Sequence, residues 1–178
     1  MASGTKPESE RELYARLVRN YATDLYRFGF RLCGDAHLAE DLVQETYGEA
    51  WRGRHGLRER AKARAWLFQI LRFRYAHHMR ARGRRPRVVG SDVGDGAGVD
   101  PNVTVGNRDE LQRALDALDD RFKVPFLMVF VEGMSTKECA GALEIPVGTV
   151  LSRLHRARAA LRLTLRPEAA ASVGGSSG

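Results

Sequence analysis

The sequence predicts an all-α fold made of two small helical domains that a flexible linker joins. Three observations lead to this prediction. Apolar residues recur at helical spacing along most of the 178 residues, no useful stretch alternates as a strand would, and one glycine-rich stretch lacks any period. The predicted parts are a first domain over residues 10–82, a linker over 83–106, a second domain over 107–166 and a disordered tail over 167–178.

The first domain is predicted to contain three helices. Steps of three and four residues mark the apolar stripe of the first, which comprises Leu13, Leu17, Tyr21, Leu25, Phe28 and Leu32. Gly34 is expected to end this helix, and Asp35 is placed to cap the next. The inner side of that second helix carries Leu38, Leu42, Val43, Thr46, Tyr47 and Ala50. A third helix is expected from about Lys62 to Arg82, with Trp66, Leu67, Ile70 and Leu71 facing inward.

The stretch 83–106 separates the two domains. It holds six glycines and two prolines, almost no large apolar residue and no period, so we expect it to let the domains move independently. Asn107 can cap a following helix, whose apolar stripe is Leu111, Ala114, Leu115 and Leu118. Further apolar residues follow, with Pro125 near a first turn or a kink.

The C-terminal segment has the pattern of a helix-turn-helix. Ser135 and Glu138 form a capping box, a short helix runs through Leu143, and a tight turn at 144–146 leads into a longer helix from about Val147. One face of the longer helix is apolar and should pack inward, namely Val150, Leu154, Ala157 and Leu161. The adjacent face carries hydroxyls and guanidiniums, the groups that read base edges in the major groove: Thr149, Ser152, Arg153 and Arg156.

The distribution of charge points to the same kind of partner. The formal net charge is +7, but residues 52–87 hold 13 basic residues and one acid, net +12, and residues 145–178 are net +4. Solvated helix faces normally mix both signs, so we expect two separate basic surfaces for an anionic partner, of which nucleic acid is the commonest.

Several other classes of protein are excluded. No stretch approaches the roughly 18 apolar residues of a membrane span, and we expect no membrane insertion. Cys33 and Cys139 are too few for a disulfide framework and are predicted to be small buried residues of a reduced cytoplasmic protein. The five histidines have no carboxylate pair, nucleophile motif or phosphate loop beside them. We therefore expect no catalytic residue, cofactor or metal.

Several motifs, in order along the chain, resemble bacterial sigma factors of the extracytoplasmic-function (ECF) group of the sigma-70 family. Residues 25–35 and 39–46, with Ala50 and Trp51, resemble the helices of that group that bind core polymerase. Residues 65–68, with Ile70 and Arg72, resemble the start of its promoter-melting helix. Residues 146–150 and 152–158 match its promoter-reading helix nearly letter for letter.

The resemblance implies roles for particular residues. Binding to core RNA polymerase, through the clamp helices of its largest subunit, would use Asp41, Leu42, Gln44 and Glu45, and the second domain would meet the flap of the second largest subunit. Binding and melting of the minus-ten element would use Arg58, Arg60, Lys62, Arg64, Gln69, Arg72, Phe73, His77 and Arg80, with Tyr75 a further candidate near bases. Binding of the minus-thirty-five element would use Lys137, Pro146, Thr149, Ser152, Arg153 and Arg156. The resemblance also implies an anti-sigma factor as a regulator.

The sequence departs from the family at some of these positions. Members often carry Asn where this chain has Phe73 and Asp where it has His77, so no base preference carries over to these positions. A lysine commonly follows the Gly-Thr-Val triplet, where this chain has Leu151. The alternative is a helix-turn-helix regulator that acts apart from polymerase, which would explain the C-terminal motif but not the basic segment 52–87.

Overall fold

The computed structural model describes residues 9–57, 59–83 and 108–165, and this part of the chain is helical throughout, without a strand. The first unit consists of α1 (Glu10–Cys33), α2 (Ala36–Arg52), two short 3₁₀ turns η1 (Arg54–Gly56) and η2 (Arg60–Lys62), and α3 (Ala63–Ala81). The second consists of α4 (Arg108–Ala117), α5 (Asp120–Phe126), η3 (Leu127–Val131), α6 (Thr136–Leu143) and α7 (Val147–Leu165). The predicted all-α fold is confirmed.

Local signals set where the first helices begin and end. Ser9 and Glu12 form a capping box at the start of α1, a signal that the sequence reading had not used. Gly34 ends α1 with φ 70°, a left-handed conformation that favours glycine, and a Cβ there would lie 3.3 Å from Asp116 Oδ2. Asp35 caps α2 by accepting a hydrogen bond from the backbone of Leu38, as predicted.

The core of the first unit comes from the predicted faces. Leu25, Phe28 and Leu32 of α1 meet Leu38 and Leu42 of α2 and Leu67, Phe68 and Leu71 of α3, and all are at least 97% buried. Thr46 is also buried, because its hydroxyl donates to the backbone oxygen of Leu42 at 2.6 Å. Cys33 departs from the prediction, since it lies at the end of α1 and remains half-exposed, whereas Cys139 is fully buried.

The second unit surrounds an irregular segment. Pro125 lies inside α5, and the chain then widens into the π-helical turn η3, where the amide of Glu132 donates to the oxygen of Leu127. Leu127 and Met128 of this turn are fully buried. Pro125 was expected near a first turn or a kink, but the spacing of apolar residues does not distinguish a π turn from a continuous helix.

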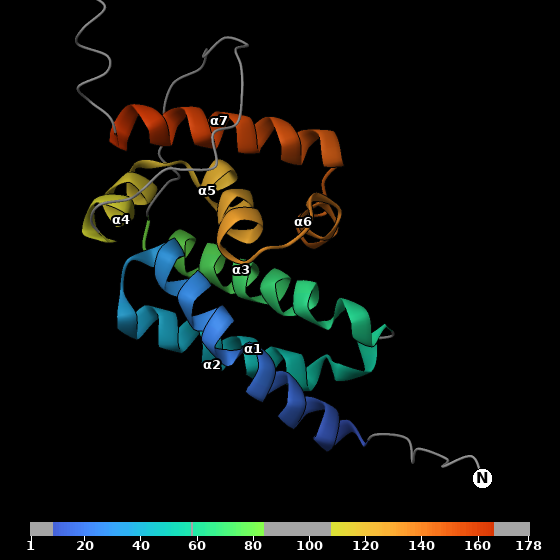
Figure 1. The fold of residues 1–178 in the computed structure, drawn as a ribbon. Coiled ribbons are helices and arrows are strands. Elements are labelled where there is room, and N and C mark those ends of the chain that lie inside the picture. The colour runs from blue at the N-terminus through green and yellow to red at the C-terminus, as the bar shows by residue number, and fades with distance from the viewer. Residues whose placement is uncertain (1–8, 58, 84–107, 166–178) are drawn as a thin grey trace, which may run out of the picture.

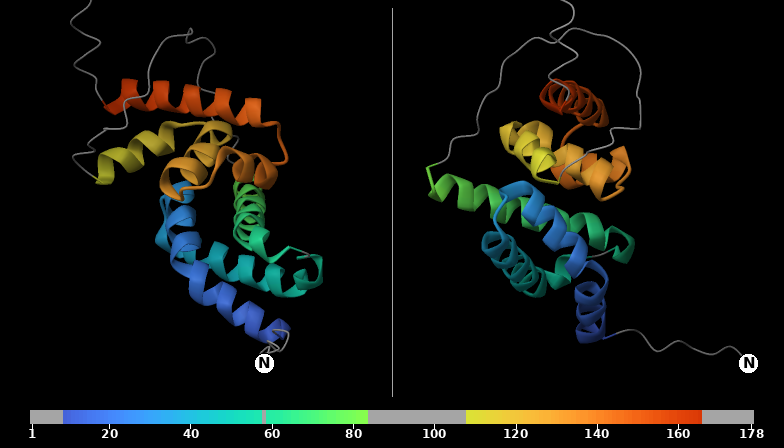
Figure 2. Two further views of the ribbon diagram at one scale, coloured as in Figure 1. Left: turned by 45° about the vertical axis from the view of Figure 1, so that its right-hand side comes forward. Right: turned by 60° about the vertical axis from the view of Figure 1, so that its left-hand side comes forward.

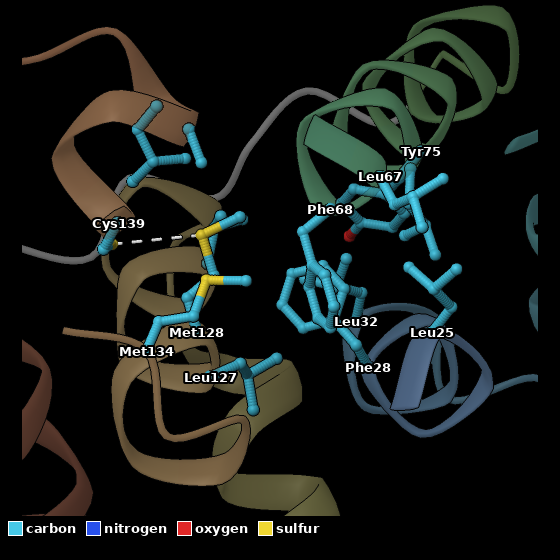
Figure 3. Close-up of a cluster of buried hydrophobic side chains, with 14 of the residues drawn as sticks. Leu25, Phe28, Leu32, Leu67, Phe68, Tyr75, Leu127, Met128, Met134 and Cys139 are labelled. Carbon is cyan, nitrogen blue, oxygen red and sulfur yellow. Dashed lines mark hydrogen bonds between the residues drawn. The ribbon is translucent and has the colours of Figure 1, made fainter. Parts of the chain in front are cut away.

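The two units lie directly against each other. Figures 1 and 2 show α3 between α1 and α2 on one side and the second unit on the other, and α6 contacts α3 while α4 and η3 contact α1. Figure 3 shows Leu127 and Met128 facing Phe28 and Phe68 across this boundary. Their independent movement therefore stays a prediction. The predicted linker beyond Gly83, the cap at Asn107 and the tail 167–178 lie outside the described residues.

Candidate nucleic-acid interface

The helix-turn-helix prediction is reproduced by α6 and α7. Ser135 accepts from the amide of Glu138 and Glu138 accepts from the amide of Ser135, so the capping box fixes the start of α6. The hydrogen bonds from Ser135 also lower the pKa of the Glu138 carboxyl. Glu144 ends α6 with φ 54°, and this left-handed residue turns the chain sharply into α7. Pro146 is exposed in this turn, and Lys137 is exposed at the start of α6.

The outward face of α7 is open along most of its length. Its opposite face is buried as predicted, through Val150, Leu154, Ala157 and Leu161. Ser152 and Arg156 are exposed, Thr149 is partly exposed, and the Ser152 hydroxyl donates to the Thr149 backbone oxygen at 3.0 Å. This places hydroxyls and a guanidinium on the N-terminal half of the helix, where a recognition helix contacts bases.

Arg153 lies differently from its neighbours on α7. It is partly buried and lines, with Arg72, Tyr75 and Asp120, a cavity of about 220 Å³ between α3 and the second unit. Burial, with a smaller contribution from the charge of Arg153, lowers the pKa of Arg72, although Glu144 acts in the opposite direction. Arg153 is therefore less exposed than its neighbours Ser152 and Arg156, because α3 packs beside it, and its contact with DNA stays a prediction.

The predicted minus-ten residues fall into two sets on α3 and the turn before it. The open set is exposed and comprises Arg60, Lys62, Phe73, His77 and Arg80. Phe73 is 47% exposed, and the Arg72 guanidinium lies 4.3 Å from the centre of its ring. Lys62 pairs with Glu59 at 2.8 Å. Arg58 lies outside the described residues.

The covered set comprises Arg64, Gln69 and Arg72, which face the second unit. Arg64 donates to the backbone oxygen of Glu132 and lies 3.6 Å from its carboxylate. Gln69 donates to the Glu144 carboxylate at 2.9 Å. The Nε of Arg72 is buried without a hydrogen-bond partner.

Tyr75, the further candidate near bases, belongs to the core. It is 5% exposed, and its hydroxyl donates to Asp120 Oδ1 at 3.1 Å. Burial raises the pKa of Tyr75 and also that of Asp120. In this arrangement Tyr75 cannot stack on a base, because the second unit covers it.

The candidate polymerase-binding residues on α2 also differ in their surroundings. Asp41 and Gln44 are exposed and available to a partner. Leu42 has no exposed surface and is a core residue, so its predicted contact with polymerase is corrected. Glu45 is half-buried and pairs with Arg74 at 2.6 Å and His78 at 3.0 Å, which joins α2 to α3.

The pairing of Glu45 has a clear electrostatic effect. Burial raises its pKa, but the hydrogen bonds from Arg74 and His78 outweigh burial, so the pKa is lowered. Histidines 77 and 78 thus have different surroundings, one exposed and one paired, as adjacent positions on a helix require. Within the described ranges no group of three His, Cys, Asp or Glu residues could hold a metal ion, and no helix is long and apolar enough to span a membrane.

Three acidic residues at the boundary between the units were missed by the sequence reading: Asp120, Glu132 and Glu144. Each belongs to the second unit and meets a side chain of α3. Glu132 is the one that the sequence could have indicated, because this single acid directly follows the apolar run 126–131. The other two give no signal, because periodicity within one helix does not identify the partner of a polar residue in a distant one.

Comparison with known families agrees with this division into two units. Residues 17–85 match the family described as Sigma-70 region 2, and residues 108–161 match Sigma-70, region 4. The chain is 38% identical over 168 residues to the ECF RNA polymerase sigma factor SigL of Mycobacterium tuberculosis, with 89% of this chain and 92% of SigL covered. It is 35% identical over 152 residues to the ECF sigma factor SigE of Mycolicibacterium smegmatis, covering 82% of this chain but only 59% of SigE.

Solved structures give the same result. The sigma factor RpoE of Bartonella quintana, in complex with the anti-sigma factor NepR, superposes with a TM-score of 0.69 at 26% identity, covering 87% of this chain and 98% of RpoE. CnrH, in complex with the cytosolic domain of CnrY, superposes with a TM-score of 0.64 at 26% identity, covering 90% of this chain and 91% of CnrH.

The chain belongs to the sigma-70 family of RNA polymerase sigma factors, in which it carries regions 2 and 4. Within that family it is an ECF RNA polymerase sigma factor, a non-catalytic protein that binds RNA polymerase and DNA and directs transcription initiation. The alternative of a helix-turn-helix regulator acting apart from polymerase is excluded, because it would not carry region 2.

Proposed function

We propose that the two units divide promoter recognition between them. Residues 10–82 bind core polymerase and hold and melt the minus-ten element, whereas residues 107–166 read the minus-thirty-five element. The observation that carries this proposal is the outward face of α7, where Ser152 and Arg156 stand exposed while the opposite face is buried. The concentration of positive charge, net +12 over residues 52–87, supports the placement of melted DNA on the first unit.

Attachment to polymerase is assigned to the exposed side of α2. Asp41 and Gln44 are free of the core and would contact the clamp helices of the largest subunit. Glu45 would act by positioning, because its ion pair with Arg74 and its contact with His78 at 3.0 Å hold α2 against α3. The second unit would meet the flap of the second largest subunit, so that polymerase sets the distance between the two DNA-binding surfaces.

The minus-ten element would meet the open set first. Phe73 offers a ring to an unstacked base, His77 lies one turn further along α3, and Arg60, Lys62 and Arg80 offer charge to the phosphates. Arg58, Arg64, Gln69 and Arg72 would complete this surface. The minus-thirty-five duplex would meet Thr149, Ser152, Arg153 and Arg156, together with Lys137 at the start of α6 and Pro146 in the turn that precedes α7.

An anti-sigma factor is the proposed regulator of this chain. One of its structural neighbours, the sigma factor RpoE, was solved in complex with the anti-sigma factor NepR and superposes on 87% of this chain. A protein that acts with RNA polymerase on promoter DNA would work in the cytoplasm.

The test of the minus-thirty-five assignment is run-off transcription from a linear promoter template with purified core polymerase and the full chain. We expect Arg156→Ala to lower initiation by about fivefold to a hundredfold, because a well-placed arginine at a base edge discriminates by ~1–3 kcal/mol. Co-purification with core should be unchanged. The matched control is Arg162→Ala, which removes the same charge from an exposed position further along α7.

Two results would contradict the assignment. Loss of core binding by Arg156→Ala would show that α7 serves polymerase instead of DNA. An equal loss of initiation in Arg162→Ala would show that only the total charge of the helix matters.

A further inference from the structure

The outward side of α7 carries two apolar side chains that have no role in the assignments above. Leu151 is 53% exposed and Val147 is 37% exposed. They are four residues apart, so they lie one turn from each other along the same strip of the helix. Neither belongs to the hydrophobic core of the residues that the structure describes. Both lie in the N-terminal half of α7, the half of a recognition helix that contacts base edges.

The rotation of ~100° per residue along an α-helix fixes where this apolar strip lies. The buried residues of α7 define its inward face, and Ser152 points almost directly away from them. Arg156 and Thr149 lie to one side of Ser152. Leu151 lies to the other side, together with His155, which is exposed. A helix in the major groove presents both sides of its outward face to the bases, so Leu151 is placed to touch DNA when Ser152 does.

The backbone of α7 is accessible on the same side. Gly148 follows Val147 on the outward face, and a Cβ added there would meet nothing within 4 Å in the described part of the chain beyond its own helix. Figures 1 and 2 show α7 along one edge of the molecule. The first two turns of α7 can therefore approach a duplex closely on the side of Leu151.

An apolar side chain in the major groove has one favourable partner among the base pairs. The C5-methyl group of thymine is the apolar group displayed there, whereas the other base edges present hydrogen-bond donors and acceptors. Leu151 can bury such a methyl group and gain the hydrophobic free energy of its burial. Against cytosine, the same side chain would cover an amino group without accepting its hydrogen bond, which costs free energy.

The size of the apolar strip and its neighbours favour DNA over a protein as the partner. A stable protein interface takes about 800 Å² from each partner and depends on several buried anchors. The strip offers only two side chains, and beside it stand the exposed Ser152 and Arg156. Residues 145–178 are net +4, which favours an anionic partner.

We propose that Leu151 is a specificity-determining residue for the minus-thirty-five element and selects thymine at one position through the C5-methyl group. Val147 continues the same apolar surface toward the start of α7. The proposal rests on the assignment of α7 to this element, and it adds an apolar determinant to the polar ones, Ser152 and Arg156.

The test removes the methyl group from the DNA and the side chain from the protein, separately and together. Deoxyuridine replaces each thymine of the minus-thirty-five element in turn, which deletes one methyl group and keeps the base pairing. Binding of preformed holoenzyme to a fluorescent promoter duplex is measured at fixed salt concentration, because affinity for DNA depends steeply on salt. We expect one thymine at which deoxyuridine weakens wild-type binding by about threefold to fivefold, the loss expected for one buried methyl group.

The variants of the chain complete the cycle. Leu151→Ala should weaken binding to the thymine promoter by a similar factor, and deoxyuridine at that position should then have no further effect. Leu151→Met keeps a long apolar side chain and should retain the dependence on the methyl group. The matched control is Leu163→Ala, which removes a leucine of similar exposure, 60%, further along α7 and should leave that dependence unchanged. Because Leu151 is exposed, its variants should keep the wild-type melting temperature and core binding.

Three results would overturn the proposal. The first is a wild-type chain that binds equally well with deoxyuridine at every thymine of the element. The second is a loss with deoxyuridine that is as large in Leu151→Ala as in wild type, since another residue would then read the methyl group. The third is loss of core binding by Leu151→Ala, which would identify the apolar strip as a contact with polymerase.

The assignment of α7 to the minus-thirty-five element is tested separately by Arg156→Ala. If Arg156→Ala lowers initiation while deoxyuridine has no effect, the assignment of α7 stands and the role of Leu151 fails. If Arg156→Ala leaves initiation unchanged and deoxyuridine has no effect, both fail.

Discussion

Phe73 is unusual among the large apolar side chains of α3, because the others face the core while 47% of its surface is exposed. The Arg72 guanidinium stacks on its ring, which holds the ring in place and leaves the rest of it to the solvent. An exposed ring held in this way can stack on any unpaired base, since every base has a π face. This differs from the asparagine that family members often carry there, which would read a base through hydrogen bonds.

We therefore predict that Phe73→Ala slows strand separation at the minus-ten element. Loss of one stacked base costs ~1–3 kcal/mol, so the fraction of open complex should fall by about fivefold to a hundredfold, and Phe73→Trp should restore it. The measurement is the fluorescence of 2-aminopurine placed in the melted region, with preformed holoenzyme. The matched control is Phe130→Ala, since Phe130 is equally exposed and also lies under an arginine, Arg158, at 4.9 Å. An equal effect of both variants would contradict a specific role for Phe73.

At the scale of the helices, the sequence predicted most of what the structure contains. The stripes of α1, α2 and α7 follow a period of 3.6 residues, and Gly34, Asp35 and Ser135 end or cap helices where expected. The turn η3 was not predicted, because a π turn keeps apolar residues facing the core for one extra residue and so looks helical. The contact between Arg64 and Glu132 was equally invisible, since the two residues are 68 positions apart.

In the candidate site, too, features within one helix could be predicted from the sequence, whereas contacts between distant helices could not. Ser152 and Arg156 could be assigned to an outward face because the buried face of the same helix defines the opposite side. The burial of Leu42 and the partial burial of Arg153 could not be predicted, because a motif match carries a residue's position and not its surroundings. Burial of Leu42 follows from α1 and α3 together, and that of Arg153 from α3, which lies in the other unit.

The two capping boxes make a testable comparison between helices. Ser135→Ala removes the cap of α6, which packs on α3 and α7, so we expect the free energy of unfolding to fall by ~1 kcal/mol. Ser9→Ala removes the same group from the exposed first turn of α1, which can fray without the rest of the fold. Ser9→Ala should therefore lower the free energy of unfolding by less than Ser135→Ala does, as measured by urea titration at pH 7. Ser152→Ala, which removes an exposed hydroxyl within α7, is the control, and a larger loss for Ser9→Ala than for Ser135→Ala would contradict the argument.

For the whole molecule, the position of charge matters more than its total. The formal net charge of +7 results from acidic and basic segments that largely cancel, and the basic ones coincide with α3 and α7, the two helices assigned to DNA. In the structure, acids of the second unit lie against part of α3.

The salt dependence of DNA binding tests whether the position of charge matters more than its total. Each phosphate neutralised on a single strand contributes ~0.7 to the slope of log affinity against log salt concentration. Arg80 is exposed in the last turn of α3, at the open end of the proposed minus-ten surface. We expect Arg80→Ala to reduce the slope by ~0.7 when preformed holoenzyme binds a promoter fork with a single-stranded minus-ten element. Arg19→Ala removes the same charge from an exposed position on α1 that has no assigned contact with DNA, and it should leave the slope unchanged. An equal decrease in both variants would show that DNA senses only the total charge of the chain, whereas a decrease confined to Arg80→Ala would place a phosphate at the end of α3.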